Sequence, residues 1–452
     1  MSKIEKLAKK VELSKLLSLL KVEDLAQESG YYKRSAKKIT ASGLVQGFWC
    51  MYQKGKNSLR SWSIHTGRAT GHAIRKQSLS ERLGKPAVDL SKRFLIERLN
   101  TRIKRGWLTR HKQDLGKGVL SHFNRILIQD STVQSLPKGL YSHFGGNHSP
   151  QGVECALMRI QATFEFLSQN WLDFSVDKYS QNDQSQAKWG LDKLEKRDLL
   201  IRDLGYFTLD ALEQLIKNQY VITSLLPNVS VLDLEGTPYN ILELVRGKDE
   251  VDMDVLVGAT KKLKMRLVAR KLTKKEKNKR IKQAKKKAHA TCKYSEEYYE
   301  LLGYEIYLTN IEKEKVEGKK IAQLYGLRWY IEIQFKAWKS FFNFKKFFKQ
   351  NEMSYERALI SIYLILTLLV YVQNDLYPYI RQKVEAGGQK TLSILKVFDV
   401  VNDFFEDLIN ITQIREVDKW IPHFEANAIY EKRKKRQNMI EKQGYPSKVG
   451  HQ

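Results

Sequence analysis

Apolar positions in the first 120 residues follow a helical period. Four leucines between Leu13 and Leu20 recur at the i, i+3, i+4, i+7 spacing that places them on one helix face. Basic residues recur from Lys33 to Arg110, with three tryptophans among them. We therefore expect residues 1–120 to be a mostly helical basic region. DNA binding and a merely solvated charged face are equal interpretations of it at this point.

From about residue 122 the pattern changes to that of strands. Short apolar runs, either rich in branched side chains or alternating with polar ones, occupy 125–129, 156–167, 171–179 and 198–201. A helix is expected over 208–218, with Thr208 as its N-cap. Strands that are followed by strand–helix alternation indicate a mixed sheet flanked by helices.

The pattern changes twice more before the chain ends. Residues 220–312 favour strands, in the runs VITSLLPN, NILELVRG, KMRLVARKL and YEIYLTNI, with a lysine-rich loop between them. Residues 318–349 are expected to be helical. The longest uncharged apolar run, Ala358–Val372, has 15 residues, short of the ~20 that span a bilayer. We expect a buried core helix there, over about 356–376, and no membrane partner.

Composition narrows the function. The chain has 452 residues and a net charge of +29, which favours a polyanionic partner such as nucleic acid. Its 42% hydrophobic content excludes a wholly disordered chain. Three widely spaced cysteines exclude a disulfide scaffold and a zinc ribbon, and they favour a reducing, cytoplasmic compartment.

The charge is unevenly distributed along the chain. Residues 1–120 hold 27 Lys/Arg and 9 Asp/Glu, a balance of +18, and residues 261–287 hold 15 and 1, a balance of +14. Residues 121–260 hold 12 and 19, a balance of −7. Basic segments thus surround a mildly acidic centre. A basic run at 432–436 lies near the end of the chain.

One segment, residues 324–339, combines polar groups that a core helix rarely carries together. Tyr325, Arg328, Glu332 and Lys339 are spaced so that all four fall within a stripe of about 60° on one helix. A functional site is one interpretation. A surface Arg328–Glu332 pair at i, i+4, worth only a few tenths of a kcal/mol, is the other.

Two aspartates follow apolar strand candidates. Asp130 follows RILIQ, and Asp203 follows DLLIR and precedes Gly205. Carboxylates at strand ends could join Glu332 in binding Mg²⁺, which prefers oxygen ligands. An aspartate in such a place is more often a turn former or a helix cap.

Together these residues resemble a known family. The Tyr-(2)-Arg-(3)-Glu-(6)-Lys spacing of 325–339 is similar to the signature of the DDE transposases of bacterial insertion sequences, in insertion-sequence family 4. Asp130 in QDSTVQSLP resembles the first catalytic aspartate of that family, and Asp203 in RDLGYF resembles the second. The resemblance covers about residues 120–375.

The resemblance implies a fold, a metal and a reaction. The fold would be α/β, with an RNase H-like core over 121–220 and 313–376, a β-rich insertion over 221–312, and helical N- and C-terminal regions. Asp130, Asp203 and Glu332 would bind two Mg²⁺, for which Mn²⁺ can substitute. The reaction would be cut-and-paste transposition through a DNA hairpin, with transposon-end DNA and target DNA as partners.

The resemblance also implies roles for other side chains. Arg328, Lys339 and Tyr325 would hold phosphates near the cleaved bond. A flipped base would stack on an aromatic residue of the insertion, for which Tyr304 and Tyr307 are candidates and Tyr304 is preferred. The basic run at 261–287 is expected to contact DNA. Two copies of the chain would bring two transposon ends together, with residues 377–452 as the candidate dimerisation region.

Two other classes of protein stay open. A DNA-binding protein derived from a transposase would have lost one of the three acids, and none is lost here. An RNase H-like nuclease would lack the polar stripe at 325–339 and usually the long insertion.

Overall fold

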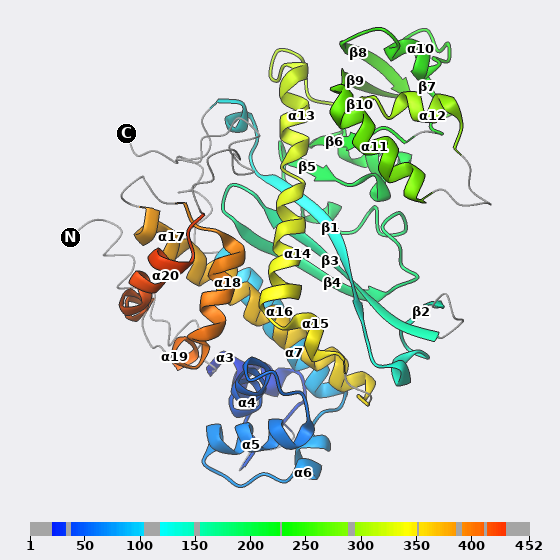
Figure 1. The fold of residues 1–452 in the computed structure, drawn as a ribbon. Coiled ribbons are helices and arrows are strands. Elements are labelled where there is room, and N and C mark those ends of the chain that lie inside the picture. The colour runs from blue at the N-terminus through cyan, green and yellow to red at the C-terminus, as the bar shows by residue number, and fades with distance from the viewer. Residues whose placement is uncertain are drawn as a thin grey trace.

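A ten-stranded mixed sheet crosses the molecule (Figure 1). The computed structural model describes residues 20–32, 38–103, 118–148, 154–226, 228–287, 294–349, 352–385, 391–410 and 414–430. The strand order is β2-β3-β1-β5-β6-β10-β9-β8-β7, and β4 pairs with β3. The strands of its first half are β1 (Ile126–Ser135), β2 (Gly145–His148), β3 (Glu154–Glu165), β4 (Asn170–Lys178), β5 (Leu199–Arg202) and β6 (Tyr220–Ser224).

The relative direction of the strands changes within this first half of the sheet. Strands β1, β3 and β4 form an antiparallel meander, whereas β5 runs parallel to β1 and β6 runs parallel to β5. The strands expected at 156–167, 171–179 and 198–201 are therefore confirmed. The helix expected at 208–218 is α9 (Leu209–Leu215), and Thr208 caps it by accepting a hydrogen bond from Ala211 N–H.

The segment 221–312 extends this sheet. Strands β7 (Val231–Leu232), β8 (Glu250–Val257), β9 (Leu263–Lys271) and β10 (Tyr304–Thr309) continue it, because β10 pairs with β6 on one side and with β9 on the other. Their buried side chains form one hydrophobic cluster with those of α9 and with Leu127 of β1 and Leu200 of β5, so this segment shares a core with the first half of the sheet. Figure 1 shows these strands grouped at one end of the molecule.

Two sequence expectations for this segment are wrong. The run NILELVRG contains a helix, α10 (Ile241–Val245), because Asn240 caps it through Leu242 and Glu243 N–H. The lysine-rich segment was expected as a loop and is helix α11 (Lys274–Lys287). Helix α12 (Glu296–Leu301) follows before β10.

Helices α13 (Gly318–Gly326) and α14 (Trp329–Phe341) lie nearly end to end across the sheet (Figure 1). Trp338 of α14 is fully buried, with its ring centroid 4.7 Å from that of Trp171 on β4. Tyr330 stacks on Phe164 of β3 at 5.5 Å. These aromatic contacts fix α14 on the sheet and so fix the side chains of its exposed stripe. A short helix, α15 (Phe344–Phe347), follows.

The described part of the N-terminal region is helical, which agrees with the prediction for these residues. Its helices are α3 (Leu20–Glu28), α4 (Ala41–Gln53), α5 (Leu59–Thr70), α6 (Lys76–Ser80) and α7 (Lys85–Ile103). Trp49 of α4 donates its indole N–H to Leu364 O at 2.9 Å, which joins this region to the central helices. The leucines at 13–17 and Trp107 lie outside the described residues.

The apolar run belongs to a buried helix. Helix α16 (Tyr355–Tyr371) continues through a π-helical turn, η5 (Val372–Leu376), into α17 (Tyr377–Glu385). The continuous helix of 31 residues is long enough to cross a membrane. The 15-residue length of the uncharged run therefore does not exclude a membrane span. However, 94% of the most apolar window is buried inside the protein. The expected core helix is therefore confirmed.

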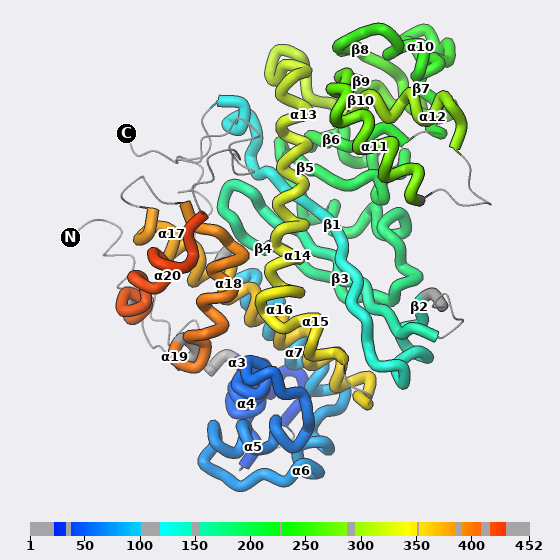
Figure 2. Tube along the Cα trace, viewed as in Figure 1, coloured from blue at the N-terminus to red at the C-terminus, as the bar shows by residue number. Residues whose placement is uncertain are grey.

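Helices also make up the described part of the C-terminal region. These are α18 (Ile394–Asp403), α19 (Phe405–Asn410), η6 (Ile414–Trp420) and α20 (Ile421–Asn427). They cluster beside α14 and α16 (Figure 2). The basic run at 432–436 lies outside the described residues.

Candidate active site

Two parallel strands bring the two aspartates together. Gln129 of β1 pairs with Arg202 of β5 in the parallel register. The residues that follow this pair on each chain segment, Asp130 and Asp203, are therefore neighbours. Asp203 follows the end of β5, as predicted. Asp130 was expected at a strand end but lies inside β1, because β1 continues to Ser135 in its pairing with β3.

The polar stripe spans the junction of α13 and α14. Leu327 and Arg328 keep helical torsions, but the N–H groups of Leu327, Arg328 and Tyr330 bond three residues back instead of four. The helix is therefore locally tightened at Arg328, and such turns often mark functional positions. Glu332 stands in the first turn of α14.

One guanidinium group contacts all three predicted catalytic acids. Arg328 Nη2 lies 2.7 Å from Glu332 Oε1, and Nη1 lies 3.3 Å from Asp130 Oδ2. Its Nε lies 3.8 Å from Asp203 Oδ1. The structure thus gathers residues that are far apart in sequence around one cation. The three acids that the resemblance implies as metal ligands therefore all lie beside Arg328.

Burial changes the proton affinities at this cluster. The side chain of Asp130 is 15% exposed, and burial raises the pKa of Asp130 to about 7 despite the opposing Ser131 N–H and Arg328. Burial alone would lower the pKa of Arg328, but the carboxylates around it raise it. Asp203 and Glu332 are 46% and 34% exposed, so the cluster opens to solvent on their side.

The other two members of the stripe make different contacts. Lys339 Nζ donates to Val133 O of β1 at 2.9 Å, and burial lowers the pKa of Lys339. The ring of Tyr325 packs against Tyr307, with centroids 4.8 Å apart. Lys339 therefore contacts β1 three residues after Asp130, toward the C-terminal end of the strand.

The donor set suits a hard divalent cation in its chemistry. Three carboxylates supply the oxygen ligands that Mg²⁺ and Mn²⁺ prefer. Among the described residues, no group of three or more His, Cys, Asp or Glu has the spacing to hold an ion as it stands. The positive charge between the acids comes from Arg328. A metal ion that bound there would therefore displace the guanidinium.

A second polar cluster behind Asp130 was not predicted. Asp183 Oδ1 accepts hydrogen bonds from Ser131 Oγ at 2.6 Å, Arg159 Nη1 at 3.0 Å and Gln161 Nε2 at 3.3 Å. Gly205 packs so closely against Asp183 that an added Cβ would lie 3.2 Å from the Asp183 side chain. Asp183 therefore holds both aspartate motifs in place.

The predicted stacking residue needs revision. Tyr304 is buried, and its hydroxyl accepts a hydrogen bond from Gly247 N–H at 3.3 Å. Tyr307 is buried as well. In contrast, Trp329 is 53% exposed directly next to Arg328, whose guanidinium carbon lies 5.7 Å from its ring centroid. Among the described aromatic residues near the acids, Trp329 has an exposed ring, and no sequence pattern had indicated it.

Comparison with known proteins assigns the class. The sequence model of the family described as "Transposase DDE domain" matches residues 121–368, more than half of the chain. The chain belongs to this family and is a DDE transposase, an enzyme that acts on DNA and depends on divalent metal.

Its relatives are transposases of insertion sequences. The chain is 28% identical over 415 residues to the transposase for insertion sequence element IS231B of Bacillus thuringiensis subsp. berliner, covering 87% of this chain and 84% of the relative. It is 26% identical over 360 residues to that for element IS1151 of Clostridium perfringens, with coverages of 74% and 72%. The solved piggyBac transposase synaptic complex with hairpin DNA aligns over 92% of this chain and 83% of that one. The TM-score of 0.36 and 11% identity are too low to support an argument.

Proposed function

We propose that this transposase cuts and joins DNA with Asp130, Asp203 and Glu332 as its catalytic acids. The observation that carries the assignment is the contact of all three acids with one residue, Arg328. We further propose that β1, β3, β4, β5 and β6 form an RNase H-like core. A meander of three antiparallel strands followed by two parallel strands supports this assignment.

The three acids together would hold two Mg²⁺ ions. Bound divalent ions polarise a phosphodiester and activate the attacking water or 3′-OH group. Asp130 and Asp203 are positioned by the sheet and Glu332 by α14, so rigid elements hold the three ligands. Burial raises the pKa of Asp130 to about 7, and a bound cation would lower it again by stabilising the buried carboxylate.

Arg328, Lys339 and Tyr325 would bind the phosphates of the cleaved strand. A guanidinium released from the carboxylates could form a bidentate contact with a phosphate. Trp329, exposed beside it, is the aromatic that we propose to contact an unpaired base. Hairpin formation, in which the freed 3′-OH attacks the opposite strand, would proceed within this arrangement.

DNA cleavage tests the assignment of the acids. Purified protein and a labelled duplex from the end of the insertion sequence should give, with Mg²⁺, a nicked strand and then a closed hairpin on a denaturing gel. Asp130→Asn, Asp203→Asn and Glu332→Gln should each lower cleavage by roughly 10³-fold or more while DNA binding persists. Glu314→Gln, which removes an exposed carboxylate elsewhere, is the matched control. Full cleavage by any of the three site variants would disprove its role.

The homodimer stays a proposal. Synapsis requires two transposon ends, and residues 377–452 were predicted to join two copies. The described part of that region also packs on its own chain, with Phe398 of α18 lying 5.5 Å from Phe342 at the end of α14. Light scattering of the protein–DNA complex should give the mass of two chains, and a mass of one chain would contradict the proposal.

A further inference from the structure

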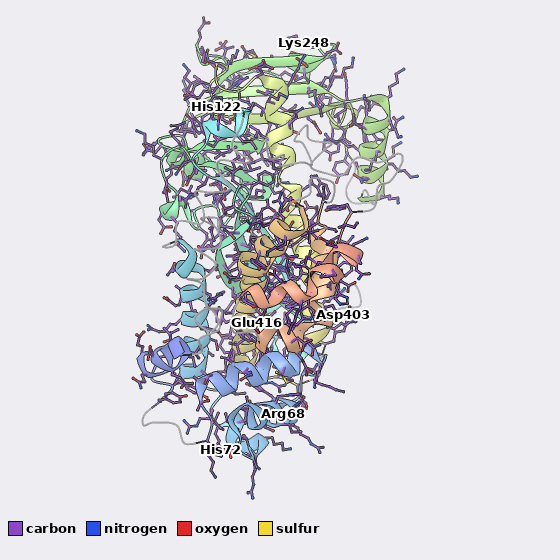
Figure 3. The ribbon with its side chains drawn as sticks, turned by 90° about the vertical axis from the view of Figure 1, so that its left-hand side faces the viewer. Arg68, His72, His122, Lys248, Asp403 and Glu416 are labelled. Carbon is purple, nitrogen blue, oxygen red and sulfur yellow. The ribbon has the colours of Figure 1, made fainter. Side chains whose placement is uncertain are left out.

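Helix α5 presents a basic face at the end of the molecule opposite the insertion strands. Figure 3 shows Arg68 and His72 at that end and Lys248 at the other. Residues 38–80 contain no Asp or Glu. They contain seven basic residues, which are Lys38, Lys54, Lys56, Arg60, Arg68, Arg75 and Lys76. Lys54 pairs with Glu406 of α19 at 2.8 Å, and the other six basic residues carry the charge that a polyanion would bind.

One face of α5 is fixed firmly on α4. Trp62 is fully buried and donates its indole N–H to Leu44 O at 3.0 Å. Gly47 lets the two helices touch, because an added Cβ there would lie 2.4 Å from Thr66 Oγ1. Ser58 caps the start of α5, and Gly71 ends it in a left-handed conformation. The helix is therefore held rigidly.

The opposite face carries a different kind of side chain. Arg60, Ile64 and Arg68 are all exposed and are spaced four residues apart, which places them on one stripe. Ile64 is 56% exposed. A single exposed isoleucine is ordinary. An exposed isoleucine between two arginines, on a helix without acids, combines the side chains that contact base edges in DNA.

We infer that the Arg60–Ile64–Arg68 face of α5 enters the major groove of transposon-end DNA and reads its sequence. The major groove admits an α-helix, arginine pairs with guanine edges, and an apolar side chain contacts the thymine methyl group. Helices α4 and α5, joined by residues 54–58, pack side by side as an antiparallel helical hairpin, with Gly43 against Thr70 and Gly47 against Thr66, so the Arg60–Ile64–Arg68 stripe lies on the face of α5 away from α4. This inference rests on the proposed function.

Helix α11 is also basic, but its exposed basic residues are lysines instead of arginines. Its exposed side chains include Lys275, Lys279, Lys282 and Lys286. Its other side is fixed by Arg280, which donates to Tyr304 O at 3.0 Å and pairs with Glu305 at 2.8 Å. Lysines act as flexible point charges that suit phosphates. We therefore expect α11 to hold DNA of any sequence, which makes it a matched control for α5.

The test compares two duplexes at one salt concentration. Fluorescence anisotropy with the full chain gives the ratio of affinities for the terminal inverted repeat and for a shuffled duplex of equal composition. Arg68→Lys keeps the charge but loses the bidentate geometry, so the ratio should fall roughly tenfold with little change for the shuffled duplex. Arg60→Gln and Ile64→Ala should lower the ratio as well.

The controls separate base reading from charge and from catalysis. Lys279→Gln with Lys282→Gln should weaken both duplexes equally and leave the ratio unchanged. Asp130→Asn should keep the ratio while it abolishes cleavage, so a failure of the catalytic assignment is distinguishable from a failure of this one.

Three outcomes would overturn the inference. If the α5 variants weaken both duplexes equally, α5 only holds phosphate. If the α5 variants leave both affinities unchanged, this face is outside the DNA complex. If the α5 variants change the mass of the DNA-free protein in light scattering, the face joins two copies of the chain.

Discussion

Arg328 places one positive charge among three carboxylates that would otherwise repel one another, and a metal ion must compete with it. Its contacts of 2.7, 3.3 and 3.8 Å with Glu332, Asp130 and Asp203 occupy the acids in the metal-free protein. Without the guanidinium the acids gain affinity for any cation, because their mutual repulsion is relieved only by the ion. Replacing Arg328 would also remove the phosphate contact that we propose for it.

Arg328→Gln should therefore separate metal binding from activity. We expect Mn²⁺ to bind several-fold more tightly by calorimetry, while cleavage falls roughly 10²-fold or more. Lys339→Gln is the matched control, because Lys339 bonds to Val133 O and has no bond to the acids in the structure. That variant should lose activity with unchanged Mn²⁺ affinity. Weaker Mn²⁺ binding by Arg328→Gln would show that Arg328 supports the metal site instead of competing for it.

Asp130 makes the stability of the metal-free protein depend on pH. Burial raises its pKa from 3.8 to about 7, so the folded protein holds more protons than the unfolded chain between these values. The free energy of unfolding should therefore fall as the pH rises from 4 through 7. In Asp130→Asn the side chain is neutral throughout, so this part of the fall should disappear.

Urea unfolding in EDTA at pH 5 and pH 8 measures that difference. Other groups titrate in both proteins, so the informative quantity is the wild-type change minus the change in the variant. Asp192→Asn, which removes an exposed carboxylate, should behave like the wild type. Equal changes in Asp130→Asn and the wild type would show that Asp130 titrates alike in the folded and unfolded states.

Local patterns predicted most elements that position the acids. The apolar runs before Asp130 and Asp203 are neighbouring parallel strands, so their carboxyl ends meet by geometry alone. The spacing of Arg328 and Glu332 placed them on one helix face, and the two side chains do pair. The strands were recognisable because they begin as continuous apolar runs buried on both faces, and α14 was recognisable because its apolar residues recur at helical spacing.

The misses at this scale have physical causes. Helix α11 was predicted as a loop because its many lysines leave almost no apolar periodicity. The face that packs on the protein is marked only by the buried Ala284 and by Arg280, which bonds to β10. Lysine is a good helix former, and those few contacts decide its conformation. Asp183 could not be found from sequence at all. Its partners Ser131 and Gly205 lie far from it along the chain, and only the folded sheet brings them together.

At the scale of the whole molecule, α7 connects the DNA-reading helices to the catalytic sheet. Arg98 of α7 forms a 2.6 Å ion pair with Asp375 in the π-helical turn, and both side chains are over nine-tenths buried. The next residue of that turn toward the N-terminus, Asn374, bonds both backbone groups of Trp171 on β4 at 2.9 Å. The turn therefore contacts α7 and the sheet at once, which holds the two functional parts in a fixed relation.

Breaking that ion pair should cost stability because it leaves a charge buried without its partner. Arg98→Met is expected to lower the free energy of unfolding by about 3–5 kcal/mol, since Asp375 stays buried. The double variant Arg98→Met with Asp375→Leu removes both charges and should regain much of the loss. Arg93→Met tests an exposed pair with Asp89 in the same helix and should change the free energy of unfolding far less. Urea unfolding followed by tryptophan fluorescence measures all three. If the double variant is no more stable than Arg98→Met, the loss comes from packing around α7 and not from the unpaired charge.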